Sequence, residues 1–113
     1  MMDSLGRAEQ EELWGLLCDT RNRVIARVQV SRGSFNSASV RIGEVFWEAI
    51  RQNAASLVVV HNHPSGDLSP SPEDIALTRS ILQAGQLQDV AVLDHIVVGR
   101  GAYKSLRAAG LGF

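Results

Sequence analysis

The sequence predicts a mixed α/β fold in which a mixed β-sheet is sandwiched by helices. The chain has 113 residues, a length typical of one domain, and 45% of them are hydrophobic, which is enough for one packed core. Its apolar residues recur with a period of two in some segments and with helical spacing in others. These segments follow one another in the order β-β-α-β-α-β-α. We expect residues 1–10 to form a flexible lead-in and residues 11–113 to form the domain.

The first half of the chain predicts a hairpin followed by a helix. An apolar run over residues 13–19 ends in turn-forming residues, and residues 24–31 then alternate between apolar and other side chains. Two such segments around a polar turn are typical of a β-hairpin. The apolar residues of segment 43–53 have helical spacing instead, which predicts a helix with one buried side.

The second half predicts a buried strand, a long helix, another strand and a short helix. Residues 57–60 form a β-branched run that leads directly into a turn-rich loop at residues 61–67. Segment 71–85 predicts a helix, because it begins with a capping serine and a proline and ends at a glycine. Residues 90–98 predict a strand, and residues 104–109 predict a short final helix.

Composition excludes several classes of function. The net charge is −1 and the 11 Lys and Arg residues are scattered, so we do not expect this chain alone to bind DNA. Cys18 is the single cysteine, which excludes an intrachain disulfide and indicates an inert core thiol in a reducing compartment. The sequence shows neither a membrane span nor a signal peptide, so we expect a cytoplasmic protein without membrane contact. Nothing in the sequence indicates a particular oligomeric state.

A candidate metal site lies where the buried strand ends. His61 and His63 are two residues apart on extended chain and therefore point to the same side. Asp74, in the first turn of the following helix, can add an oxygen ligand. Three protein ligands and one open position are typical of catalytic zinc. The alternatives are ordinary hydrogen-bonded histidines and, for Ser71 and Asp74, a helix capping box.

A hydrolytic zinc site also needs a base for its metal-bound water. Glu44 is the first candidate, although a carboxylate at a helix N-terminus is also favourable without any catalytic role. Glu48 is a weaker candidate, because we expect it to pair with Arg51. Ser71 can donate a hydrogen bond to a developing oxyanion while its oxygen caps the helix. The residues therefore predict a metal-dependent hydrolase.

Several other residues allow a structural and a functional interpretation. His95 lies in the middle of a predicted strand and is either a satisfied core histidine or a residue that orients a ligand. Asp67 could be an alternative oxygen ligand, but its setting is first that of a turn. Trp14 and Trp47 are core or interface aromatics. Two histidines and one carboxylate also bind Fe²⁺ in non-haem iron enzymes, so iron is the alternative metal.

The residues Glu44, His61-x-His63, Ser71 and Asp74 resemble the motif of the JAMM (MPN+) metalloproteases. The strings HNHPSGD at 61–67, EDIALT at 73–78 and LDHIVVG at 93–99 are similar to the RadC branch of that group. The resemblance extends from about Glu12 to Leu106.

This resemblance implies a JAB/MPN, cytidine-deaminase-like fold and a zinc site. His61, His63 and Asp74 would be the ligands, Glu44 the general acid and base, and Ser71 the oxyanion helper. JAMM proteins cleave peptide or isopeptide bonds, and the RadC branch has been associated with DNA repair. Two departures stand out: the residues at 41–43 are Arg-Ile-Gly where His-Pro-Arg is expected, and RadC proteins carry a DNA-contacting helix-hairpin-helix region without a counterpart in these residues.

Three functions follow from these observations. The first is a zinc-dependent hydrolase that cleaves an amide bond in a peptide or protein. The second is an accessory domain in DNA transactions, which would bind DNA with steep salt dependence. The third is a structural metal-binding domain without turnover, which metal removal would destabilise.

Overall fold

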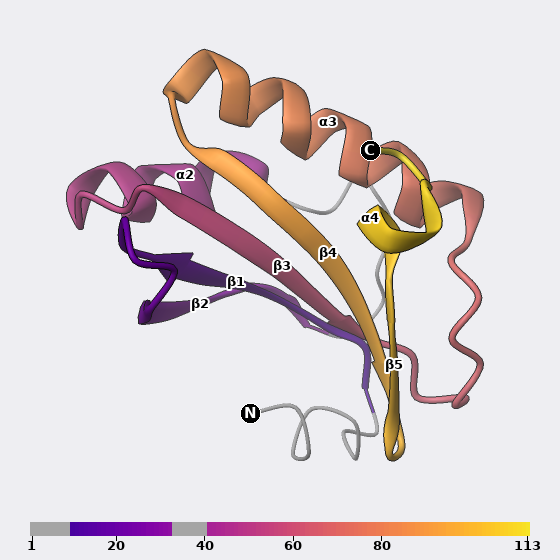
Figure 1. Ribbon diagram of the computed structural model, residues 1–113. Helices are drawn as coiled ribbons and strands as arrows, with labels where there is room; N and C mark the ends of the chain where they lie inside the picture. The colour runs from indigo at the N-terminus through magenta and orange to yellow at the C-terminus, as the bar shows by residue number, and fades with distance from the viewer. Residues whose placement is uncertain (1–9, 33–40) are drawn as a thin grey trace.

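The computed structural model describes residues 10–32 and 41–113. Five strands form one sheet: β1 (Glu12–Cys18), β2 (Val24–Arg32), β3 (Ser56–Asn62), β4 (Ala91–Gly99) and β5 (Ala102–Ser105). Their order is β2-β1-β3-β4-β5, with β3 and β4 parallel and the other neighbours antiparallel. The helices are α2 (Ile42–Arg51), α3 (Pro72–Gln88) and α4 (Leu106–Ala109) (Figure 1). The predicted α/β class and the mixed sheet are therefore confirmed.

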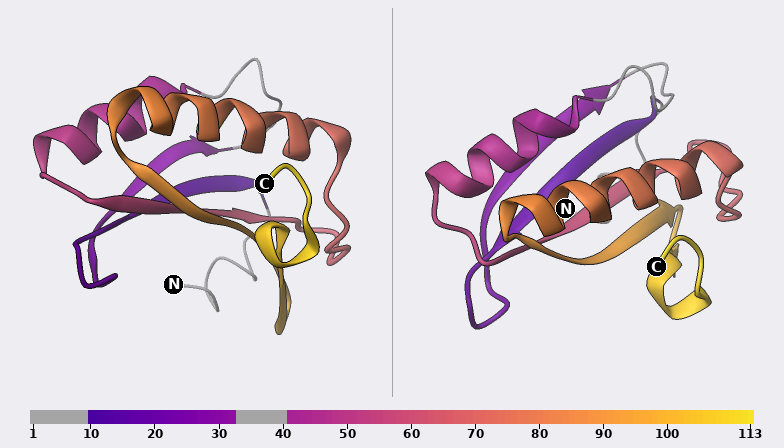
Figure 2. Two further views of the ribbon diagram at one scale, coloured as in Figure 1. Left: turned by 45° about the horizontal axis from the view of Figure 1, so that its top comes forward. Right: turned by 90° about the horizontal axis from the view of Figure 1, so that it is seen from above.

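The main core lies between the sheet and the two long helices. Helices α2 and α3 lie on the same face of the sheet (Figures 1 and 2). Because side chains alternate along a strand, Leu57 and Val59 of β3 point towards these helices. They pack with buried residues of β1, α2, α3 and β4, namely Leu13, Leu17, Val45, Phe46, Ala49, Leu77, Ile81 and Val92. This packing fixes the ends of β3 and α3 that carry the predicted ligands.

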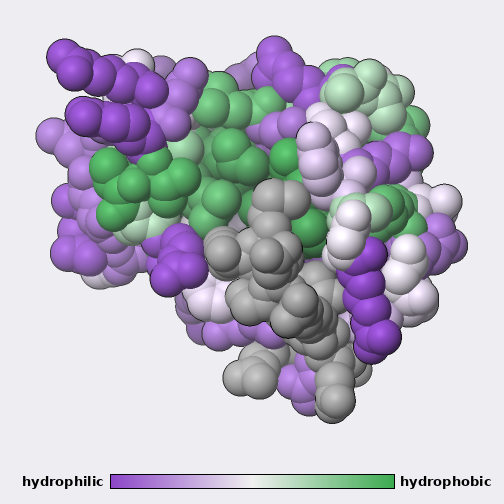
Figure 3. Space-filling view, turned by 60° about the horizontal axis from the view of Figure 1, so that its bottom comes forward, coloured by the Kyte–Doolittle hydropathy of each residue, from purple (hydrophilic) through white to green (hydrophobic). Residues whose placement is uncertain are grey.

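The other face of the sheet carries a second apolar cluster. Val60 and Val98 are buried there, with Trp14, Leu16 and Val58 packed against them. Figure 3 shows that apolar side chains gather across this side of the molecule. Trp14 is thus a core residue, whereas Trp47 is 62% exposed on α2 and packs against Arg51.

Helix α3 continues past Gly85, where the sequence analysis ended it. Its C-terminal cap is Asp89, which has a left-handed backbone with φ of 56°. A Cβ atom at Gly85 would lie 2.6 Å from the carbonyl oxygen of Val90. The glycine therefore permits a close approach between α3 and the chain that leads into β4, and it does not end the helix.

The short strand β5 was not expected, because the sequence analysis placed a helix over residues 104–109. β5 pairs with β4, and Ser105 then caps α4 by accepting a hydrogen bond from the Ala108 amide at 3.0 Å. The Ser105 hydroxyl also donates to Asp94 at 2.6 Å, which ties this helix start to β4. A four-residue strand that depends on a tertiary partner leaves little local pattern in the sequence.

Two further expectations concern the ends and the environment of the chain. Almost all of the expected lead-in, residues 1–10, lies outside the described residues. Within the described part of the chain, we find no helix of the length and apolar character needed to cross a membrane. Cys18 is buried, and burial raises the pKa of its thiol, as expected for an inert core cysteine.

Candidate metal centre

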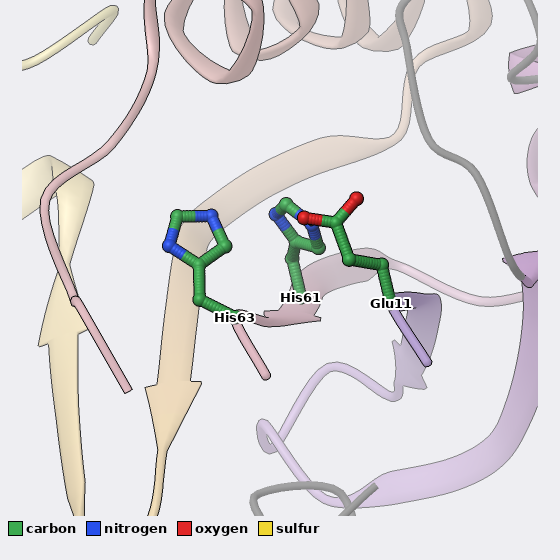
Figure 4. Close-up of side chains that lie close together, drawn as sticks. All are labelled: Glu11, His61 and His63. Atoms are coloured by element: carbon green, nitrogen blue, oxygen red, sulfur yellow. The ribbon is translucent and has the colours of Figure 1, made fainter. Parts of the chain in front are cut away.

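Two histidines and one carboxylate converge where β3 ends and β1 begins. His61 is fully buried (0% exposed) in β3, and His63 follows the strand with its ring centroid 4.8 Å from that of His61. Antiparallel pairing places Leu13 of β1 opposite His61, so the preceding Glu11 reaches the same end of the sheet. Potential ligand atoms of Glu11, His61 and His63 all lie within 4.8 Å of one another. Figure 4 shows the three side chains pointing towards a common space.

Asp74 joins this group from the first turn of α3. Its carboxylate oxygens lie 3.3 Å from His61 Nδ1 and 3.1 Å from His63 Nε2, and the residue is 1% exposed. The Ser71 amide donates to the carboxylate at 2.8 Å, and the Asp74 amide donates to the Ser71 hydroxyl oxygen at 3.1 Å. The predicted capping box is therefore present, and the same cap directs Asp74 towards both histidines.

The protonation of these groups follows from their contacts. Burial raises the pKa of Asp74, but the hydrogen bonds from His61, His63 and the Ser71 amide outweigh it and hold the pKa far below its ordinary value. Asp74 is therefore ionised at neutral pH. The hydrogen bond to Asp74 raises the pKa of His63, and burial opposes this rise only in part.

The orientation of His63 determines which of its nitrogens is available to a ligand. Its Nδ1 lies 2.7 Å from the Asp67 carbonyl oxygen, which can only accept, so Nδ1 carries the proton. Gly66 makes the necessary turn with φ of 86°, a conformation that favours glycine. Asp67 thus acts through its main chain, while its side chain accepts from the Ser69 amide at 2.9 Å as in an ordinary turn.

This arrangement fits a divalent cation. In neutral His63 the unprotonated Nε2 would face an Asp74 oxygen, so two acceptors would meet unless a proton or a metal ion lay between them. Two ligand atoms on one tetrahedral zinc ion lie roughly 3.4 Å apart. The distances of 3.1 and 3.3 Å from Asp74 to the histidines are close to that value. Imidazole nitrogens and a carboxylate are also the donors that zinc prefers.

The structure does not place Glu44, the predicted base, among these side chains. Glu44 lies in the first turn of α2, where its carboxylate is 3.2 Å from Arg41 and its side chain is 50% exposed. Its position is that of a favourable charge at a helix N-terminus. The glutamate beside the histidines is Glu11, because strand pairing brings β1 to β3 although the two are distant in sequence.

The neighbouring glutamates have other partners. Glu48 pairs with Arg51 at 2.8 Å, as expected. Glu12, next to Glu11, accepts from Trp14 Nε1 and from Gln29 Nε2, each at 3.1 Å. Strand alternation turns it away from the histidines, so Glu11 is the carboxylate of this pair that reaches them.

A buried histidine supports the centre from β4. The His95 ring lies 6.0 Å from that of His61, and its Nδ1 is 2.6 Å from Thr78 Oγ1. Thr78 donates its hydroxyl hydrogen to the Asp74 carbonyl oxygen at 2.9 Å, so His95 Nδ1–H donates to Thr78. Burial, followed by the nearby charge of His61, lowers the pKa of His95 to about 4. His95 is thus the predicted buried histidine, and it also links β4 to the helix turn that carries Asp74.

His63, Glu11 and Asp74 line a pocket of about 500 Å³, beneath which His61 is fully buried. Its lining is polar and acidic and consists of Glu11, His63, Pro64, Ser65, Asp67, Ser69, Ser71, Glu73 and Asp74. Four of these nine residues are carboxylates, and none is Lys or Arg. A substrate can therefore reach the centre, and the lining favours cationic groups over anionic ones.

Known proteins are similar to this chain over nearly its whole length. The family model of the RadC-like JAB domain matches residues 1–111. The chain is 53% identical over 113 residues to a UPF0758 protein of Chloroflexus aggregans and 53% identical over 113 residues to one of Roseiflexus castenholzii, covering 100% of this chain and 49% and 48% of those proteins. A UPF0758 protein of Desulforudis audaxviator is 46% identical over 111 residues, which are 98% of this chain and 48% of that protein. This chain thus spans about half the length of the curated relatives it matches. By its family match and its sequence identity to these relatives, the chain belongs to the RadC-like JAB domain family.

Proposed function

We propose that this chain is a zinc-dependent hydrolase that cleaves an amide bond in a peptide or protein. The observation that supports the proposal best is the convergence of Glu11, His61, His63 and Asp74, because Glu11, His63 and Asp74 also line an open pocket. Two imidazoles and one ionised carboxylate would hold the ion, and one further carboxylate stands beside them. Membership of the JAB domain family agrees with this chemistry.

His61, His63 and Asp74 would hold the ion. When bound, zinc supplies Lewis acidity that makes water a better nucleophile and polarises a carbonyl oxygen. Glu11 lines the pocket and is only partly buried, so it can take a proton from water and return it to the leaving amine nitrogen. The proton that water gives up when it attacks the carbonyl carbon is thus the proton that the amide nitrogen needs in order to leave as an amine.

Ser71 also faces the pocket and retains a hydrogen for a substrate. Its oxygen accepts the Asp74 amide in the capping box, which leaves its hydroxyl hydrogen outside that bond. We propose that this hydrogen is donated to the carbonyl oxygen of the scissile amide as negative charge develops there.

The negative charge of the pocket lining also favours some classes of substrate over others. A nucleic acid would bring phosphates towards a lining that, among the described residues, has four carboxylates and no Lys or Arg. Peptides with a basic residue beside the scissile bond would meet favourable charges instead. We therefore favour a peptide or protein substrate over the accessory role in DNA transactions.

The test compares two glutamate variants in the zinc-loaded full chain. Quenched-fluorescence peptides and ubiquitin-like fusions serve as substrates, with EDTA as the check for metal dependence and elemental analysis to distinguish zinc from iron. We expect Glu11→Gln to keep its metal and to lose about 10²–10⁴-fold in turnover, because an amide cannot accept the proton. The matched control, Glu44→Gln, should keep both metal and turnover. Full activity of the Glu11→Gln variant would refute the role of Glu11.

A further inference from the structure

Asn62 lies between the two histidines in sequence but makes its contacts elsewhere. It is the last residue of β3 and is buried. Since side chains alternate along a strand, its carboxamide points to the opposite face from His61. The residue is therefore not a candidate ligand, and its buried polar group requires hydrogen-bond partners.

Both partners of the Asn62 carboxamide belong to the main chain around Glu11. Asn62 Oδ1 accepts a hydrogen bond from the Glu12 amide. Asn62 Nδ2 donates to the Gln10 carbonyl oxygen at 2.8 Å. One side chain thus holds the peptide groups on either side of Glu11.

This contact extends the pairing of two strands beyond the point where their regular register ends. The register of β1 with β3 ends at the pair Leu13 and His61. Glu11 precedes the first residue of β1, at the end of the strand, where a backbone frays most readily. The Asn62 carboxamide has the same donor and acceptor as a peptide group and can continue the pairing there.

We propose that Asn62 is a positioning residue that fixes the direction of the Glu11 side chain towards the histidines. The inference rests on the proposed function, in which Glu11 transfers the proton. The Glu11 carboxylate lies 3.9 Å from His61 Nε2 and contacts the pocket without being fully buried. Holding the backbone on both sides of Glu11 limits the directions that its flexible side chain can take. Asparagine fits this task, because aspartate would offer an acceptor to the Gln10 carbonyl oxygen and place a negative charge near Glu11.

The test separates positioning of Glu11 from general loss of structure. Asn62→Ala removes both hydrogen bonds, and Asn62→Asp keeps the acceptor for the Glu12 amide. Ser105→Ala is the control, since it removes two hydrogen bonds near α4 without touching residues 10–12. Each full-length variant is measured by amide hydrogen exchange, by zinc affinity in competition with a chelator, and by kcat and KM on a peptide that the unsubstituted protein cleaves.

We expect Asn62→Ala to abolish the exchange protection of the Glu12 amide while amides of α3 and β4 stay protected. Zinc affinity and KM should change little, and kcat should fall about 10²-fold, because a displacement of about 1 Å can cost that much. Asn62→Asp should lie between Asn62→Ala and the unsubstituted protein, and it remains informative if Asn62→Ala does not fold. Ser105→Ala should keep the protection of Glu12 and the full kcat.

Unchanged protection of the Glu12 amide in Asn62→Ala would overturn the proposal. An equal loss of zinc affinity and of kcat would also overturn it, since that result indicates collapse of the whole centre. If the unsubstituted protein cleaves no substrate, the hydrolase proposal fails, but loss of Glu12 protection alone would still support the positioning of Glu11.

Discussion

Acidification should lower the unfolding free energy of this protein by protonating His95, and a variant without this histidine can separate that effect from other effects of pH. His95 has an ordinary pKa of 6.5, and burial lowers it to about 4 in the folded chain. The unfolded chain therefore binds the proton more readily than the folded one. The stability that neutral His95 contributes is fully present above pH 6.5 and is lost as the pH falls towards about 4. The difference between the two pKa values, at about 1.4 kcal/mol per pH unit, corresponds to about 3 kcal/mol of unfolding free energy.

Urea denaturation of the metal-free protein at about pH 7 and about pH 4 measures this loss. The comparison variant is His95→Asn, which keeps a donor for Thr78 Oγ1 but does not titrate. All other ionisable side chains are the same in both proteins, so the comparison isolates the contribution of His95. We expect the unsubstituted protein to lose about 3 kcal/mol more than His95→Asn over this range. An equal loss in both proteins would refute the reasoning, because it would mean that folded His95 takes up a proton without cost.

Two further predictions concern packing and metal. Gly85→Ala should lower the unfolding free energy by about 1–3 kcal/mol in urea denaturation, because its Cβ would meet the Val90 carbonyl oxygen at 2.6 Å. Gly43→Ala in α2 has nothing within 4 Å of its Cβ and should be neutral or stabilising, so equal losses in both variants would contradict the packing argument. Removal of zinc with a chelator should lower the melting temperature, since an ion at 100 times its Kd stabilises the fold by about 2.7 kcal/mol. Calorimetry with and without the chelator measures this change, and an unchanged melting temperature would count against a bound ion.

Much of the fold was predictable because its patterns are local. The alternation at residues 24–31 predicts β2, and the helical spacing over residues 43–53 predicts α2 with small errors at its ends. β5 was missed because its four residues are extended only through pairing with β4. Gly85 predicts a helix end, but its role in the structure is the lack of a side chain where α3 closely approaches the Val90 carbonyl oxygen.

The candidate site likewise combines residues that local patterns predict with one that only long-range strand pairing brings in. The proximity of His61, His63 and Asp74 was predictable, because the histidines share one side of a strand end and the next helix begins with a cap. Their role as metal ligands stays a prediction. The carboxylate beside them was assigned to Glu44 on a nearby helix, whereas Glu11 arrives through strand pairing between distant segments.

Contacts between residues that are far apart in the sequence cannot be predicted from local residue spacing. The Asn62 contact with Glu12 spans 50 residues, and the contact between Thr78 and His95 joins α3 to β4. One cue does point to β1: Glu11 and Glu12 lie at the start of an apolar segment, and a strand formed there must pair with another strand of the sheet.

The central claim is that His61, His63 and Asp74 hold one divalent ion. The most direct test is the zinc content per chain after dialysis, measured by elemental analysis for the unsubstituted protein and for His63→Ala. We expect about one zinc ion per chain in the unsubstituted protein and a strong reduction in the variant, because three protein ligands become two. An unsubstituted chain that retains no metal, or a His63→Ala chain that retains as much as the unsubstituted one, would contradict it.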